Sequence, residues 1–252
     1  MAGRGGGGGR AAAPPRGRDA RPGLGRALGG RGQGHVGGGD RRVGGGAGAG
    51  GDDGVDGPPV VAVPSGNFGN LCAGMLTQAS GLPIGHFIAA CNANDPVPGY
   101  FRTGGQYAAQ TAVPTISNAM DVGNPSNFVR ILELFGHDFS RLQQTLSADT
   151  VSDADTKATI AQVWQEHNYL LDPHGAVAYT ALRRYLDQHP GQQGFFLATA
   201  HPVKFPDVVE EITGQPVPLP EAVRHLQGRT KQAVPLPPDY AALRDFLWQH
   251  GR

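Results

Sequence analysis

The sequence is poor in cysteine and in long apolar runs, and each shortage argues against a class of protein. Among its 252 residues there are two cysteines, Cys72 and Cys91, which form no CxxC motif. This argues against a disulfide framework or a cysteine-bound metal site and predicts two buried thiols in a reducing compartment. No apolar run approaches the ~20 residues that span a bilayer, and the N-terminus lacks the apolar centre of a secretory signal. We expect a cytoplasmic protein with no membrane partner.

The first 57 residues lack lysine, serine, threonine and aromatic side chains altogether. They hold 24 of the 40 glycines and 9 of the 18 arginines, so the net charge of zero is a cancellation between a basic leader and an acidic remainder. Too few large apolar side chains are present to offset the entropy of ordering so much glycine. We therefore predict that residues 1–57 form a disordered, low-complexity leader.

Three interpretations of this leader compete. Its Arg-Gly steps are similar to those of RNA-binding RGG tails, but no Phe or Tyr is interleaved with them. A transit peptide is also rich in arginine, yet it should contain serine, and the first serine here is Ser65. Gly, Ala, Arg and Pro have GC-rich codons and make up 44 of the first 57 residues but only 66 of the remaining 195. We favour the third interpretation, an out-of-frame or mis-started reading of GC-rich DNA.

The remainder, residues 58–252, carries all 18 aromatic side chains and an α/β pattern. Runs of β-branched and apolar residues predict strands over 60–63, 86–90 and 194–200. Apolar spacing and capping residues predict helices over 71–80, 125–135, 152–167, 172–188, 206–213 and 239–250, with a proline-rich linker at 216–220. The strand–helix–strand order at its start indicates a βαβ unit and therefore a parallel sheet.

The segment PSGNFGN at 64–70 joins the first predicted strand to a helix. Such a turn gathers backbone N–H groups and the positive end of the helix dipole around one point, which suits a phosphate group. Gly66 and Gly69 would let the backbone approach the anion closely. The segment is neither a Walker A sequence nor GxGxxG, which disfavours nucleoside triphosphates and dinucleotides. By geometry alone, an ordinary tight turn with an asparagine cap is equally compatible with it.

Five segments, in order, resemble the signatures of threonine synthases, pyridoxal-phosphate enzymes of fold type II. They are PSGNFGN at 64–70, CNAND at 91–95, TISNAMDVGNPSNF at 115–128, DPHGAVAY at 172–179 and ATAHPVKF at 198–205. The fourth departs from the family's DPHTAVAY at Gly175. The resemblance covers 58–252 and none of the leader. It implies an incomplete α/β fold of the tryptophan-synthase-β type, the C-terminal portion of a threonine-synthase-like catalytic domain.

The resemblance also implies the reaction and its site. O-phosphohomoserine and water would become threonine and phosphate, with pyridoxal 5'-phosphate held by a lysine as a Schiff base. The implied cofactor contacts are Ser65, Gly66, Asn67, Phe68, Gly69, Asn70 and Thr199, the last facing the pyridine nitrogen. The implied substrate contacts are Ser117, Asn118, Asp121, Asn127, His201 and Lys204. Each asparagine is also compatible with a turn or helix cap. His174 either acts near the site or bonds to the first turn of its own helix, and we favour the second interpretation.

The three lysines of the chain, Lys157, Lys204 and Lys231, all follow the glycine loop, whereas the family's Schiff-base lysine precedes it. None matches that anchor. We therefore expect no catalytic lysine here, no activity of this chain alone, and a missing N-terminal half as its partner. Three alternatives stay open: another fold type II lyase or dehydratase, a non-catalytic cofactor- or phosphate-binding protein, and an RNA-associated protein. The SNAMDVGNPSNF segment argues against the first, and nucleic acid is a disfavoured partner.

Overall fold

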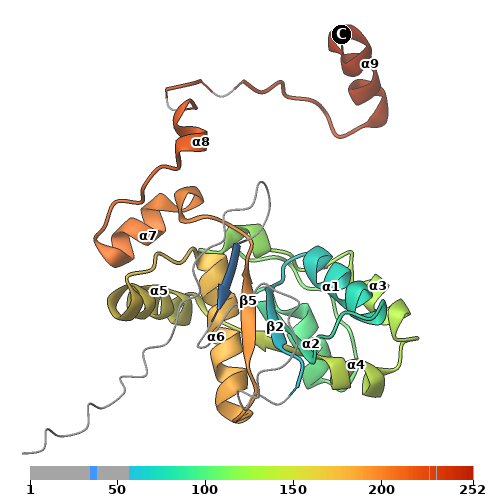
Figure 1. Cartoon of the computed structure of the whole chain (residues 1–252). Helices are drawn as coiled ribbons and strands as arrows, with labels where there is room; N and C mark the ends of the chain where they lie inside the picture. The colour runs from blue at the N-terminus through green and yellow to red at the C-terminus, as the bar shows by residue number, and fades with distance from the viewer. Residues whose placement is uncertain (1–34, 39–56, 227, 231, 252) are drawn as a thin grey trace, which may run out of the picture. The chain divides into compact units, whose positions relative to one another are not determined.

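A computed structural model describes residues 35–38, 57–226, 228–230 and 232–251 of the chain (Figure 1). The described chain divides into two compact units, residues 1–217 and 218–252. The boundary falls within the proline-rich linker predicted at 216–220, where no helix or strand is present. The prediction for the leader lies outside the described residues, apart from Gly57 and a short strand at His35–Gly38.

The first unit is built on a five-stranded sheet in the order β1-β5-β2-β3-β4. Its strands are β1 (His35–Gly38), β2 (Val60–Pro64), β3 (His86–Cys91), β4 (Leu146–Thr150) and β5 (Gly194–Ala198). Strands β5, β2, β3 and β4 are parallel, whereas β1 pairs with β5 in the antiparallel sense. The predicted βαβ unit and parallel sheet are confirmed, because β2 and β3 pair in parallel around helix α1.

The helices of the first unit are α1 (Gly69–Ala79), α2 (Pro96–Arg102), α3 (Phe128–Leu134), α4 (Phe139–Thr145), α5 (Asp153–His167), α6 (Pro173–Gln188) and α7 (Pro206–Thr213), with 3-10 turns η1 (Asn118–Met120) and η2 (Pro202–Lys204). Helices α5, α6 and α7 begin where the sequence predicts, whereas α1 begins two residues earlier than predicted, at Gly69, and α3 three residues later, at Phe128. Ser152 caps α5 by accepting from the Asp155 N–H at 3.1 Å, and its hydroxyl donates to the Asp155 carboxylate at 2.9 Å. This reciprocal pair is the predicted capping box.

Two apolar clusters cover the two faces of the sheet. Along β2, Val60 and Ala62 pack with residues of α5 and α6, whereas Val61 and Val63 pack on the other face with residues of α1 to α4. Figure 1 shows α6 along one side of β2 and β5, with α1 and α3 on the other side. Because both faces are buried, β2 reads as a continuous apolar run rather than an alternating one.

Both cysteines lie buried in the cluster beside α1, and neither forms a disulfide. Burial raises the pKa of the Cys91 thiol, because a thiolate there would be cut off from water. The prediction of two buried thiols is therefore confirmed.

Several elements were not predicted from the sequence. Strand β4 reads LSADT and lacks a β-branched run, while α2 contains Pro96, Pro98 and Gly99 within seven residues. Helix α4 and strand β1 are further additions. Each is a short element, and the compositions of β4, α2 and β1 favour a loop.

The second unit contains α8 (Glu221–Arg224) and α9 (Tyr240–His250), of which only α9 was predicted. Asp239 caps α9 by accepting from the Ala242 N–H at 2.9 Å. Four large apolar side chains of α9 are exposed: Tyr240, Leu243, Leu247 and Trp248. In the part of the chain that the structure describes, no helix is both long and apolar enough to cross a membrane.

Candidate active site

The predicted anion loop leaves the carboxyl end of β2 and enters α1. Ser65 fixes its start, because its N–H donates to Ala90 O and its Oγ donates to Val63 O, both at 2.8 Å. Phe68 stands in the left-handed region, at φ 63° and ψ 15°, and gives α1 no side-chain cap. That conformation is uncommon for a non-glycine residue and costs on the order of 1–3 kcal/mol. The first-turn N–H groups of α1 are therefore left without a side-chain acceptor, at the positive end of the helix dipole.

A second signature segment braces this loop from the side. The Asn67 Oδ1 accepts from the Ser126 N–H at 2.7 Å and from the Ser126 Oγ at 3.1 Å, and the Asn127 Nδ2 donates to Asn67 O at 3.0 Å. Gly66 packs directly against the backbone of η1, since a Cβ there would lie 2.6 Å from the Met120 Cα. The loop can hold its shape only with glycine at this position.

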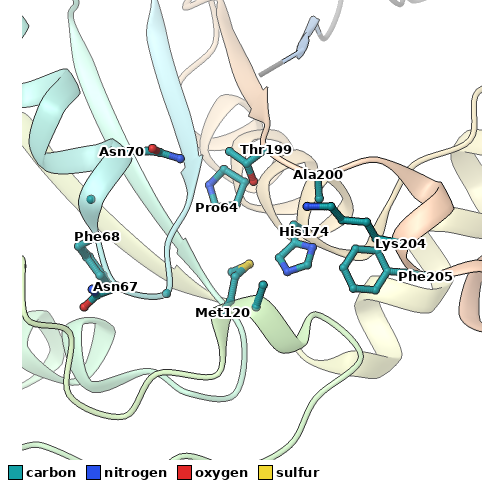
Figure 2. A pocket seen from close by; sticks show the side chains of 13 residues that line it. Pro64, Asn67, Phe68, Asn70, Met120, His174, Thr199, Ala200, Lys204 and Phe205 are labelled. Carbon is teal, nitrogen blue, oxygen red and sulfur yellow. The ribbon is translucent and has the colours of Figure 1, made fainter. Parts of the chain in front are cut away.

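A cavity of about 240 Å³ opens beside the loop (Figure 2). Its walls come from the loop after β2, the start of α1, η1, the start of α6, the segment after β5, and η2. The lining residues are Pro64, Gly66, Asn67, Phe68, Gly69, Asn70, Ala119, Met120, His174, Thr199, Ala200, Lys204 and Phe205. Six of the seven expected cofactor residues therefore line one cavity, and the seventh, Ser65, is buried beneath it.

His174 is the most deeply buried polar side chain of this cavity. Only 3% of its side chain is exposed, and its Nδ1 lies 3.1 Å from the Asp172 Oδ1. The same carboxylate oxygen accepts from the N–H groups of His174 and Gly175, at 2.9 and 3.3 Å, and so caps α6. The His174 Nε2 is buried without a hydrogen-bond partner. The His174 ring thus bonds to the N-cap residue of its own helix rather than to the first turn, while its other ring nitrogen has no partner among the described residues.

Two of the expected substrate residues form a polar network away from the cavity lining. The Asp121 Oδ1 accepts from Asn92 Nδ2 at 2.8 Å, Asn94 Nδ2 at 3.0 Å and Thr115 Oγ1 at 2.7 Å, and its Oδ2 accepts from the Thr115 N–H at 3.0 Å. Ser117 is fully buried, and its Oγ accepts from Asn92 Nδ2 at 3.0 Å. In this arrangement these side chains stabilise the 113–121 segment through bonds within the protein.

Of the other expected substrate residues, only Lys204 lines the cavity. Asn118 is exposed at the start of η1, and Asn127 braces the loop as described. His201 caps η2, since its Nδ1 accepts from the Val203 N–H at 3.1 Å. Substrate contacts from these residues stay a prediction, whereas His174, Met120 and Phe205 line the cavity without having been chosen. The Asp-Pro-His string at 172–174 was the available signal for His174.

Among the described residues, no group of three or more His, Cys, Asp or Glu side chains is placed so that it could hold a metal ion. The lining is instead rich in backbone N–H groups, with one lysine, one histidine and one hydroxyl. Such a set suits an anionic organic ligand held at a helix N-terminus.

A parallel α/β sheet whose glycine loop and late strand end meet at one cavity is the architecture of pyridoxal-phosphate enzymes of fold type II. A family model described as "Threonine synthase, C-terminal" matches residues 175–247. The chain is 46% identical over 188 residues to threonine synthase of Serratia marcescens, covering 75% of this chain and 43% of that one. It is 44% identical over 191 residues to the Escherichia coli enzyme, covering 76% of this chain and 44% of that one.

Solved structures give the same result. The crystal structure of Escherichia coli threonine synthase superimposes with a TM-score of 0.69 at 40% identity, over 79% of this chain and 45% of that one. The pyridoxal-phosphate-bound threonine synthase of Brucella melitensis superimposes with a TM-score of 0.67 at 29% identity, over 77% and 47%. The chain thus spans less than half the length of these relatives. Over this span the chain is similar to the C-terminal part of threonine synthases.

Proposed function

We propose that this chain supplies the C-terminal part of a threonine synthase, which converts O-phosphohomoserine and water to threonine and phosphate. The observation that carries the proposal is the single cavity to which the glycine loop and Thr199 both contribute. Pyridoxal 5'-phosphate would supply an electron sink for the negative charge that develops at the substrate carbons. The substrate is a small molecule, and the cytoplasm is the expected location for such a biosynthetic step.

The residues of the cavity fit the phosphate end of this cofactor. The α1 N-terminus has no side-chain cap, and the left-handed turn at Phe68 directs the loop around it. Gly69 leaves the backbone accessible, Gly66 lets the loop pack against η1, and Asn70 adds a polar side chain to the lining. Backbone N–H groups at a helix N-terminus bind phosphate through hydrogen bonds and the dipole together.

The other wall of the cavity suits the ring. Thr199 lies just beyond the end of β5 and presents a neutral hydroxyl, which would bond to the pyridine nitrogen without donating a full charge. Met120 and Phe205 provide apolar surface that excludes water from that region. These contacts would orient the ring, while the loop holds the phosphate.

We also propose the domain division expected from the sequence, with residues 58–252 as the catalytic portion and 1–57 as a leader. None of the lysines provides the anchor seen in the family pattern. Lys157 lies on α5 with its Nζ 3.8 Å from a Glu211 carboxylate oxygen, Lys204 lines the cavity after the loop, and Lys231 lies outside the described residues. The cofactor should therefore bind to this chain by its phosphate and ring, without a covalent bond.

The proposal is tested by cofactor binding to the purified 252-residue chain. Pyridoxal 5'-phosphate should bind at least about tenfold more tightly than pyridoxal, because charge-assisted hydrogen bonds to the phosphate contribute ~1.5–3 kcal/mol each. Gly66→Ala should weaken binding at least about tenfold, since its Cβ would lie 2.6 Å from the Met120 Cα and force the loop to move.

Gly99→Ala is the matched control, because a Cβ there meets nothing closer than the Arg102 Nη2 at 3.7 Å. It should leave cofactor affinity unchanged. Equal affinities for pyridoxal and its phosphate, or equal effects of the two alanine variants, would contradict the proposed phosphate loop. Borohydride should trap no lysyl adduct, and a stoichiometric adduct on Lys204 would overturn the non-covalent mode of binding.

A further inference from the structure

The cavity has a second end whose chemistry the glycine loop does not explain. Figure 2 shows Asn67 and Phe68 on one side of the cavity and His174, Lys204 and Phe205 on the other, with Met120 between them. A phosphate held by the loop would leave this second end available for another part of the ligand.

His174 is set there as a hydrogen-bonding group that lacks its partner. Its side chain is 97% buried, yet the Nε2 has no acceptor or donor beside it within the described structure. A buried polar atom left without a hydrogen bond costs about 1–3 kcal/mol. The Nε2 belongs to a residue that lines the cavity, so a bound ligand can supply the missing partner.

The charges around His174 define what that partner is. Behind the ring, the Asp172 Oδ1 lies 3.1 Å from Nδ1 and fixes the orientation of the imidazole, so that a ring carrying a proton on both nitrogens donates from Nε2 into the cavity. In front of it, the Lys204 amine extends over the same part of the cavity in Figure 2 and has no ion pair with a described residue. The Phe205 ring packs on the imidazole with centroids 4.8 Å apart, and the other lining residues carry no charge.

We propose that His174 and Lys204 form a second oxyanion site in this cavity, which recognises the phosphoryl group of the amino-acid substrate. Two donors from different elements, one fixed by Asp172 and one on a flexible stem, suit a tetrahedral oxyanion rather than a planar group. The assignment of the phosphoryl group to the substrate rests on the proposed function, whereas the oxyanion site itself does not.

The test follows the His174 imidazole directly, by nitrogen-15 NMR of the purified chain during titration with inorganic sulfate. Sulfate keeps its charge between pH 5.5 and 8.5, so ligand protonation does not confuse the result. The His174 Nε2 signal, identified by its loss in His174→Gln, should shift saturably as sulfate binds. Acetate is the planar comparison and should bind at least about tenfold more weakly.

Lys204→Gln should weaken the sulfate response of His174 about tenfold, the loss expected for one charge-assisted hydrogen bond. Lys157→Gln removes an equally long cation from an exposed site on α5 and should change nothing. If His174→Gln does not fold, the wild-type titration and the two lysine variants still decide the question.

The backbone N–H signals of Gly66 and Gly69 separate this inference from the proposed function. A response of these glycines without a response of His174 would overturn the second oxyanion site and leave the cofactor loop intact. A response of His174 alone would support the second site and contradict the phosphate loop. If sulfate changes neither the glycine N–H signals nor the His174 Nε2 signal, or if acetate and sulfate bind equally at His174, the inference is also overturned.

Discussion

Replacing Asp121 with alanine should destabilise the chain without removing any residue that lines the cavity. The carboxylate accepts four hydrogen bonds, two of them from Thr115, at 2.7 Å through Oγ1 and 3.0 Å through the backbone N–H. Its other donors keep partners, because Asn92 Nδ2 also reaches Ser117 Oγ at 3.0 Å and Asn94 Nδ2 also donates to a backbone carbonyl. The Thr115 hydroxyl also lies 3.2 Å from the Ser117 Oγ, so the Thr115 N–H is the donor that loses its acceptor. With the bonds to the charged carboxylate gone, we expect a total loss of about 3 kcal/mol.

Urea denaturation followed by far-ultraviolet circular dichroism measures this loss. With a slope of ~2 kcal/mol per molar, typical of a small protein, the midpoint should fall by about 1.5 M. Asp138→Ala is the control, because its carboxylate is exposed and caps α4 through one bond, at 3.1 Å from the Arg141 N. That variant should lose about 1 kcal/mol. Equal midpoints for the two variants would refute the network as the main role of Asp121.

Three further predictions concern the helix cap, acid stability and catalysis. Ser152→Ala should lower the free energy of unfolding by about 1 kcal/mol, measured by the same denaturation, because the Asp155 N–H loses its acceptor. Burial, and secondarily the neighbouring His189, lower the pKa of His86 below 6.5, so its contribution to stability is present above pH 6.5 and is lost as pH falls through the lowered value. His86→Gln should flatten the pH dependence of the urea midpoint in that range, and an unchanged slope would contradict this. The purified chain should release neither threonine nor phosphate from O-phosphohomoserine, and measurable threonine would contradict the need for an upstream lysine.

The elements that were predictable carry their signals locally. Strand β2 is a β-branched run, and α5, α6 and α9 each begin after a capping Ser or Asp whose side chain accepts from the first turn. Strand β4 was not predictable in this way. Its residues become a strand only because Leu146 and its neighbours pair with β3 in parallel register, a partnership about sixty residues away in sequence.

The features of the site also differ in whether a local sequence signal predicts them. The glycine loop was readable, because an uncapped helix start after a strand needs only adjacent residues. Whether a polar side chain contacts a ligand or other protein groups could not be predicted from the sequence. Ser117 and Asp121 were compatible with either. The structure gives them protein partners. For His174 it pairs Nδ1 with Asp172 and leaves Nε2, among the described side chains, as a buried atom without a hydrogen-bond partner.

Because Asn67 is held by hydrogen bonds to the 126–127 segment, binding of a ligand at the glycine loop depends on contacts that are distant in the sequence. The bonds that shape the loop join residues 59 and 60 positions apart in the sequence, and the cavity also needs His174 and Lys204 from much later in the chain. Contacts of such long range form late in folding, after the entropy of closing large loops has been overcome. No isolated fragment around the glycine loop can present a finished cavity, so anion binding there reports that residues 64–205 have folded together.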